Sequence, residues 1–406
     1  MSVTSIPANI GDAGFARPRS DKLIVAGALL FMLVAAGLIA EAISYRQGSL
    51  LLIGAALGVT LYHSSFGFTG GWRAFVTRRR GAGIRAQMLL LGIATAFIMP
   101  LLALGQIGGQ PLAGALGPIG VSLVTGSVMF GFGMQLGGGC ASGTLFTAGG
   151  GNLRMVVTLI FFITGAIIGT AHLPWWGSLP NIGVVLPAQY IGLWPATMLQ
   201  LAGLAAIALY VTWAEKRHHG ALAPANPPKI DARPWLARVL QGPWPLFNGA
   251  VVLALLSVLT FVVSGHPWSV TFGFNVWGAK LLTLTGVDVA SWEYWNWPMP
   301  AQALKAPILA DTTSVMDFGL ILGALMVAGL AGKFAPSIRI PLKSLAAAVI
   351  GGLLMGYGAR LAFGCNIGAL LGGISSGSLH GWVWFAAAFI GSLGGIRARP
   401  LFGLEK

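Results

Sequence analysis

The chain has 406 residues, of which 56% are hydrophobic and 8% are charged. An ordinary soluble domain carries about 25% charged residues, so a water-soluble fold of this length is excluded. Apolar stretches recur from one end to the other and are continuous rather than alternating, which argues against a transmembrane β-barrel. The composition therefore predicts an all-α polytopic membrane protein.

The formal net charge is +14, from 24 basic and 10 acidic residues. Most of the basic residues lie beside apolar segments, where they orient a membrane protein. We therefore expect the lipid bilayer as a partner and no nucleic acid. Two cysteines are too few for a disulfide scaffold.

About ten apolar segments are long enough to be considered as membrane crossings. In chain order they cover residues 23–42, 49–63, 86–104, 119–138, 155–171, 191–213, 247–264, 314–331, 344–363 and 382–395. A helix needs about 20 residues to cross the hydrocarbon, so the second and tenth segments are short. The first segment is too long for the core of a signal peptide and is expected to be retained.

Every second connection between these segments is basic. The residues concerned are Arg17, Arg19, Lys22, Arg73, Arg78, Arg79, Arg80, Arg85, Arg154, Lys216, Arg217, Lys229, Arg233, Arg238, Lys333, Arg339, Lys343, Arg397, Arg399 and Lys406. Cytoplasmic connections of membrane proteins carry such an excess of lysine and arginine. The pattern predicts a multi-pass protein with both termini in the cytoplasm.

Two segments of 18 residues match each other. GSVMFGFGMQLGGGCASG covers residues 126–143, and GGLLMGYGARLAFGCNIG covers residues 351–368. Aligned on cysteine, they share seven identical residues, including Cys140 and Cys365, the two cysteines of the chain. A weaker match, Phe-Gly-Phe at 66–68 and at 272–274, lies upstream of each motif.

The predicted orientation makes the two halves inverted relative to each other. The segment before Cys140 would run inward, whereas the segment before Cys365 would run outward. Inverted repeats of transporters are related by a two-fold axis in the membrane plane. We expect an N-terminal region with one extra helix (1–48), a first repeat (49–213), a basic cytoplasmic linker (214–246) and a second repeat (247–406).

Each cysteine motif is expected to break a helix near the middle of the membrane. Gly139 and Gly364 permit a bend directly before the cysteines, and Gly143 and Gly368 follow one turn later. The short helix after each break would direct its free N–H groups at the break. Two such ends, facing each other from opposite leaflets, would form a site for an anion.

A thiol at a helix N-terminus can donate a weak hydrogen bond to a soft acceptor such as the terminal sulfur of thiosulfate. The alternative is that both cysteines are small buried apolar residues. Arg360 is either a counter-charge for the anion or a side chain that reaches the membrane interface. Polar residues that follow the cysteines either line a polar path or cap short helices: Ser142, Asn366, Thr144, Asn152, Ser375, Ser376, Ser378 and His380.

The sequence shows no metal-ligand spacing, including around His218 and His219, and no nucleotide-binding motif. We therefore expect no cofactor, and transport that is passive or coupled to an ion.

Both cysteine motifs, with the later segment GWVWFAAAFIGSLGGIRARP, resemble the YeeE/YedE family of bacterial inner-membrane sulfur transporters. The resemblance covers roughly residues 54–400. It implies thiosulfate uptake through an hourglass-shaped protein of inverted repeats, in which thiols at a narrow middle pass the anion along by S–H···S hydrogen bonds. Cys140 and Cys365 match two family cysteines, and Gly67 stands where a third is usual. A small cytoplasmic sulfur-carrier protein is an implied partner.

The sequence thus predicts a transporter for thiosulfate or a related small anion, not an enzyme. One alternative is a membrane thiol–disulfide oxidoreductase that uses Cys140 and Cys365, although no Cys-x-x-Cys is present. Another is a channel or receptor for an anion without sulfur.

Overall fold

The computed structural model describes residues 20–223, 234–334, 336 and 339–405. Five basic residues used to predict the orientation lie outside these ranges: Arg17, Arg19, Lys229, Arg233 and Lys406. Within the described part the only strands form a two-residue antiparallel ribbon, β1 (Gln106–Ile107) and β2 (Gln110–Pro111). The remaining elements are helices.

The first half of the chain contains α1 (Lys22–Ala42), α2 (Tyr45–Ser64), α3 (Phe68–Arg78), α4 (Ala82–Ala103), α5 (Val121–Gly137), α6 (Ala141–Gly149), α7 (Leu153–Gly177), α8 (Ala188–Ile191) and α9 (Leu193–His219). The second half contains α10 (Trp235–Gln241), α11 (Leu246–Ser264), α12 (Thr271–Leu284), α13 (Pro298–Lys305), α14 (Thr312–Leu330), α15 (Leu342–Leu361), the π-helix η4 (Asn366–Leu371), α16 (Gly372–Ser375) and α17 (Leu379–Ala398). Four short 3₁₀ helices complete it: η1 (Val289–Ser291), η2 (Glu293–Asn296), η3 (Ile308–Ala310) and η5 (Arg399–Phe402).

Ten helices or broken helices of the described residues are long and apolar enough to cross a membrane. Each of the ten predicted segments overlaps one of them, which confirms the all-α polytopic class. The two segments that looked short are full-length helices, because α2 and α17 each continue through polar residues at their ends. Side-chain caps start several helices: Asp21, Ser44, Asn152 and Asp311 accept hydrogen bonds from the first turns of α1, α2, α7 and α14.

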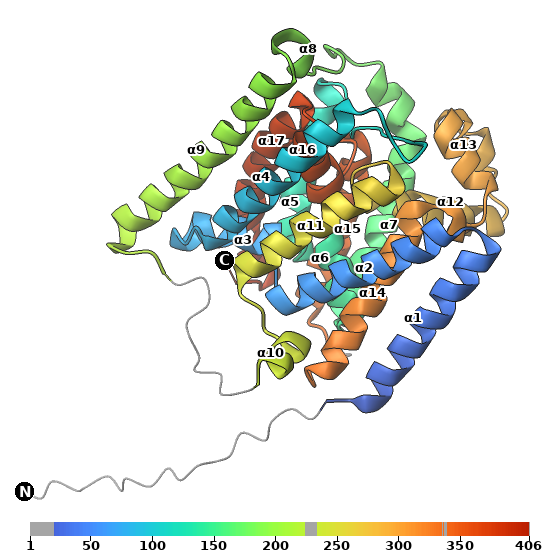
Figure 1. The fold of residues 1–406 in the computed structure, drawn as a ribbon, viewed down its shortest axis with the longest axis horizontal. Coiled ribbons are helices and arrows are strands. Elements are labelled where there is room, and N and C mark those ends of the chain that lie inside the picture. The colour runs from blue at the N-terminus through green and yellow to red at the C-terminus, as the bar shows by residue number, and fades with distance from the viewer. Residues whose placement is uncertain (1–19, 224–233, 335, 337–338, 406) are drawn as a thin grey trace, which may run out of the picture.

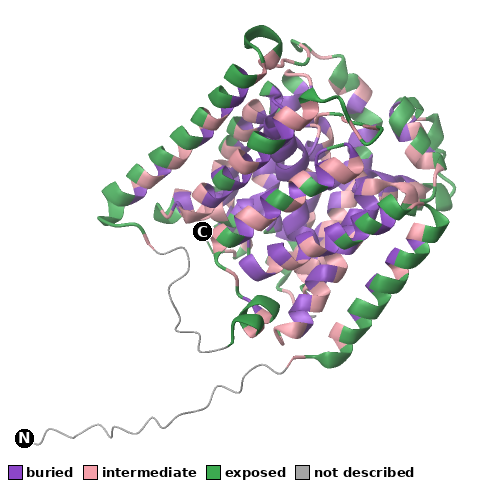
Figure 2. Ribbon diagram, viewed as in Figure 1, coloured by how far each residue is buried: buried purple, intermediate pink, exposed green. Residues whose placement is uncertain are grey.

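The helices form one bundle with two ends (Figure 1). One end carries α8 and α13, and we call it the α13 face. The other carries α10, and we call it the α10 face; α1 starts on this side. Figure 2 shows that α1 and α9 are largely exposed along their length, whereas the middle of the bundle is buried. The two peripheral helices therefore present apolar surface that suits a lipid environment.

The centre of the bundle is the crossing of α5 and α15. A Cβ added to Gly126 would lie 2.6 Å from the carbonyl oxygen of Gly358, and one added to Gly358 would lie 2.6 Å from that of Gly126. Gly133 and Gly351 repeat this relation, at 2.8 Å in both directions. In the aligned motifs, Gly126 corresponds to Gly351, and Gly133 corresponds to Gly358. The contact between Gly126 and Gly358 is therefore equivalent to the contact between Gly351 and Gly133. The antiparallel crossing therefore has the two-fold relation expected of inverted repeats.

Outer contacts of the same helices follow the same relation. A Cβ on Gly131 of α5 would lie 1.9 Å from the carbonyl oxygen of Ala388 on α17. One on the matching Gly356 of α15 would lie 2.0 Å from that of Phe162 on α7. Small residues let membrane helices approach this closely, which accounts for much of the glycine content. The exact boundaries proposed for the repeats remain predictions.

Candidate functional site

Cys140 and Cys365 occupy equivalent places in two helix breaks. Cys140 is the N-cap of α6 (φ −80°, ψ −170°), and Cys365 is the N-cap of η4 (φ −109°, ψ −165°). Both are buried free thiols. The short elements that they precede, α6 and η4, contact each other. The two breaks are therefore brought together, as the repeat predicts.

The backbone turns in the same way before each cysteine. The second residue before Cys140 is Gly138 (φ +94°), and the second before Cys365 is Phe363 (φ +58°). Glycine adopts this left-handed conformation without strain, whereas phenylalanine does not. At the next position, a Cβ added to Gly139 would lie 3.1 Å from the carbonyl carbon of Gly143. The first break therefore folds back on the first turn of α6.

The same close approach occurs at the second break. A Cβ on Gly364 (φ +149°) would lie 2.7 Å from the amide nitrogen of Ala369 and 3.0 Å from the carbonyl carbon of Gly368. A Cβ on Gly143 would lie 3.5 Å from the Cys140 sulfur, so glycine leaves that side of the thiol uncovered. The predicted glycines thus shape the two breaks, and Gly143 leaves one side of the Cys140 sulfur uncovered.

Two further half-helices, α3 and α12, were not expected from the sequence. Gly67 is the N-cap of α3, and Val270 is the N-cap of α12. The Phe-Gly-Phe triplet at 66–68 therefore spans a break, whereas the triplet at 272–274 lies inside the first turn of α12. Reading the triplets as equivalent positions was wrong, because the sequence match ignores where each helix begins. A Cβ on Gly67 would meet nothing within 4 Å.

A cavity of about 260 Å³ opens at the α10-face ends of α4 and α11 and reaches the first break. Its lining includes Gly67, Thr69, Gly139, Cys140 and Gly143. Among the described residues, no lysine, arginine, aspartate or glutamate lines it. We call it the small cavity.

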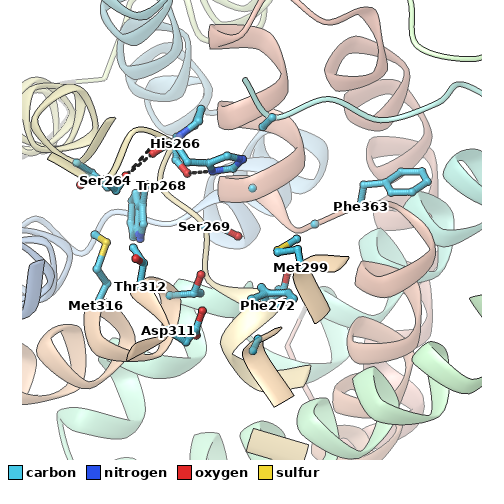
Figure 3. Close-up of a pocket in the computed structure, with 18 of the residues that line it drawn as sticks. Ser264, His266, Trp268, Ser269, Phe272, Met299, Asp311, Thr312, Met316 and Phe363 are labelled. Carbon is cyan, nitrogen blue, oxygen red and sulfur yellow. Dashed lines mark hydrogen bonds between the residues drawn. The ribbon is translucent and has the colours of Figure 1, made fainter. Parts of the chain in front are cut away.

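A larger cavity of about 660 Å³ lies toward the α13 face and reaches the second break at Gly364 and Gly368 (Figure 3). In Figure 3, Asp311, Thr312 and Met316 lie on the side opposite to Phe363. Cys365 itself is not part of the wall but lies between the two lining glycines. This is the large cavity. The two cavities approach the cysteine motifs from opposite ends of the bundle.

Among the described residues, Arg360 is the only basic side chain of the lysine or arginine type that lines the large cavity. Its Nη1 donates a hydrogen bond of 2.8 Å to the hydroxyl of Tyr294, and its guanidinium lies 4.9 Å from the centre of that ring. The Nε donor has no partner among the described residues. The side chain is thus held at the cavity wall with donor capacity to spare, which suits an anion.

Asn366 follows Cys365 and is fully buried, yet neither its amide oxygen nor its nitrogen has a hydrogen-bond partner among the described residues. Buried polar groups are normally bonded, so an open amide at the break points to a transient partner. Ser142 lies at the other break, where its hydroxyl is 3.5 Å from the Cys140 sulfur. Both predicted polar residues therefore lie beside a thiol.

The other polar residues predicted near the cysteines have separate placements. Thr144 donates to the carbonyl of Cys140, and Asn152 caps α7. Ser376 accepts from the amide of Ala115, and His380, which bonds Ser378, lines the large cavity. His218 and His219 contact each other, and no group of three metal-ligating side chains occurs in the described ranges.

Arg154 is a residue whose role the sequence did not indicate. Its Nη1 and Nη2 donate to the carbonyls of Gly137 (2.6 Å) and Leu136 (2.7 Å), the last residues of α5. Its Nε donates to Ser344 at the start of α15. Arg154 therefore holds the end of α5 in place directly before the Cys140 break, by satisfying carbonyls that a helix end leaves open.

A family model described as sulphur transport matches residues 63–393. The chain belongs to this family, the YeeE/YedE family. The YedE proteins of Escherichia coli (strain K12) and Salmonella typhimurium, each named a probable transporter, are 34% and 33% identical to it over 156 residues. Those matches cover 38% of this chain and 37% of the relatives, so they span little more than a third of either protein.

Two longer matches carry a substrate in their names. The thiosulfate transporter TsuA of Escherichia coli (strain K12) is 24% identical over 353 residues, which cover 84% of this chain and 91% of that protein. The TsuA of Spirochaeta thermophila is 26% identical over 348 residues, which cover 82% and 93%. The residues matched by the family model, 63–393, include both cysteine motifs.

Proposed function

We propose that this protein takes up thiosulfate, or a related small sulfur-containing anion, through the region between the large and small cavities. One observation carries the proposal: cavities from opposite ends of the bundle lead to the two cysteine breaks, and α6 packs against η4 between them. The names of the TsuA relatives favour thiosulfate among sulfur anions. Alternating access around such a central site is the usual device of inverted-repeat transporters.

The chemistry along the route suits a soft anion. Arg360 supplies the positive charge at the large cavity, where a hydrated anion would first be attracted. Deeper in, Cys140 lines the small cavity and supplies a thiol. Cys365 and Asn366 are buried between the lining residues Gly364 and Gly368, where they would supply a second thiol and amide donors. A weak, polarisable donor bonds the sulfur end of thiosulfate without holding it too tightly to leave.

We also propose that the α10 face is cytoplasmic, that the membrane is the bacterial inner membrane, and that a small sulfur-carrier protein collects the product there. A separate cavity of about 440 Å³ on this face is lined by Arg154, Lys333 and Arg339. Its positive charge would attract an acidic surface or the anion itself. Retention of a purified carrier by the detergent-solubilised protein would test this partner.

The proposal is tested by uptake of radiolabelled thiosulfate into liposomes that contain the purified protein. We expect time-dependent uptake that unlabelled thiosulfate suppresses and that sulfate suppresses far less, because sulfate lacks a soft sulfur acceptor. Empty liposomes are the control. Uptake that sulfate suppresses equally well would favour a channel for anions without sulfur, and no uptake at all would reject the proposal.

A further inference from the structure

Asp317 is a buried acid that the proposed route does not use. It is the sixth residue of α14, its side chain has no exposed surface, and neither Oδ1 nor Oδ2 accepts a hydrogen bond from a described residue. An ionised carboxylate without a partner is costly to bury, and such a group takes up a proton instead. An ionisable residue inside a membrane protein is a functional candidate for this reason.

The matching place in the first half holds a neutral residue. Gln87 is the sixth residue of α4, and a Cβ on Gly71 of the half-helix α3 would lie 2.7 Å from its Nε2. In the second half a Cβ on Gly273 of α12 would lie 3.0 Å from the Oδ2 of Asp317. The two side chains thus occupy the same kind of contact between a long helix and a half-helix.

The side-chain amide of Gln87 has hydrogen-bond partners, whereas the carboxyl group of Asp317 has none among the described residues. Gln87 accepts from the indole of Trp72 (2.9 Å) and donates to the carbonyl of Gly67 (3.2 Å). Asp317 makes no such bonds. A purely structural role would have been served by glutamine or asparagine in both halves, so the acid at one of them points to a need for a group that gains and loses a proton.

Asp317 lies next to the route. Thr313 and Met316, on the same turn of α14, line the large cavity, so the cavity is within one helical turn of the carboxyl. Gly364 and Gly368, which flank Cys365 at the second break, line the same cavity. An anion at the second break would therefore interact with the charge state of Asp317.

Few other ionisable groups face this position. Asp311 precedes the same helix and accepts hydrogen bonds from Ser314. On α12, the ammonium of Lys280 donates to the carbonyls of Leu304 and Ala306. Helix α6, which also packs against α14, contains no ionisable side chain. On the other helices that pack against α14, the ionisable side chains lie at helix ends or on α10: Lys22, Glu41, Tyr45, Arg46, Tyr62, His63 and Arg238.

We propose that Asp317 binds a proton that accompanies the anion, so that uptake is proton-coupled; this inference rests on the proposed function. A negative charge at Asp317 repels an anion at the second break, and a proton removes that repulsion. By linkage, an anion at the break favours protonation to the same degree. The proton enters from the water of the large cavity and leaves toward the opposite face together with the anion.

The test uses the full chain in liposomes, with labelled thiosulfate outside and a pH-sensitive dye inside. We expect an inward proton gradient to accelerate uptake by the natural protein at least about fivefold, the lower end of typical coupling, and uptake to acidify the lumen. D317N imitates the protonated carboxyl. It should take up thiosulfate at a rate that the gradient does not change and without acidifying the lumen.

D288N is the matched control, because it removes the same charge from an exposed acid in the connection after α12 and should behave like the natural protein. Gradient-driven acidification by D317N, or uptake by the natural protein without acidification, would overturn the inference and leave the proposed function standing. Absence of uptake by the natural protein would overturn both. If D317N is not recovered from the membrane, D317E keeps a proton-binding group and should retain lumen acidification; its loss would count against the inference.

Discussion

Cys140 and Cys365 each contact the residue two positions further on, one through a side-chain hydroxyl and the other through a backbone amide. The Cys140 sulfur lies 3.5 Å from the hydroxyl of Ser142, and the Cys365 sulfur accepts from the amide of Ile367 at 3.4 Å. Both sulfurs therefore sit over the first turn of a short helix, where free N–H groups and the helix dipole favour negative charge. A bound anion would be shared between these ends.

Gly143 keeps the Cys140 thiol accessible. A Cβ there would lie 3.5 Å from the sulfur, an ordinary contact, so Gly143→Ala fits without strain but covers one side of the thiol. We expect a several-fold lower rate of thiosulfate uptake with an unchanged melting temperature. A variant that transports normally would show that access to Cys140 from this side is not needed.

Arg360 is expected to set the affinity for the anion. Hydrogen bonds to charged groups contribute about 1.5–3 kcal/mol, so Arg360→Gln should raise the KM for thiosulfate roughly tenfold or more. Arg360→Lys keeps the charge and should lose less. The effect should weaken as salt is added, because screening reduces attraction to the cavity. An unchanged KM in both variants would assign Arg360 to structure alone, through its contact with Tyr294.

Close helix contacts predict which glycines are needed for stability. Gly131→Ala would force a Cβ to within 1.9 Å of the Ala388 carbonyl oxygen, so α5 and α17 would have to separate. Such overpacking costs about 1–3 kcal/mol, and the melting temperature in detergent should fall. Gly27→Ala on the exposed face of α1 meets nothing within 4 Å and should leave the melting temperature unchanged or raise it. Equal effects of the two changes would contradict the packing.

Asp311 predicts a pH dependence of stability. Burial raises its pKa above the ordinary value of 3.8, although hydrogen bonds from Ser314 oppose the shift. The folded protein then binds this proton more tightly than the unfolded chain, so the contribution of Asp311 to stability grows as the pH falls toward 3.8 and is lost as the pH rises through the folded-state pKa. Asp311→Asn removes this pH-dependent contribution to the stability of the folded protein.

The melting temperature of the natural protein minus that of D311N should therefore increase as the pH is lowered from about 7 to about 4. The exposed Asp288→Asn change should give a nearly constant difference. A difference that decreases toward low pH would contradict the sign of the shift.

The sequence predicted the long helices and the two cysteine breaks because both leave strong local signals. Continuous apolar runs of about 20 residues have few alternatives to a membrane helix. The cysteine motifs were found because Cys140 and Cys365 repeat within a matched frame of glycines, which a comparison of the chain with itself can detect.

The rest depends on contacts between distant segments. Helices α3 and α12 are short and contain glycine, tryptophan and polar residues, so neither gives an apolar run. Arg154 is indistinguishable in sequence from a charge that only orients the protein, and its bonds to the end of α5 appear only in three dimensions. Asp317 is one acid in an apolar segment, and only its missing hydrogen bonds set it apart.

The most direct test of the account is the initial rate of labelled thiosulfate uptake into liposomes by the natural protein, C140A, C365A and the double variant, at equal amounts of folded protein. Each thiol is expected to contribute about one hydrogen bond in the buried middle. Loss of one such bond costs about 1–1.5 kcal/mol, so each single variant should be roughly tenfold slower and the double variant close to empty liposomes. Uptake by the double variant at the natural rate would contradict a route that passes the two thiols.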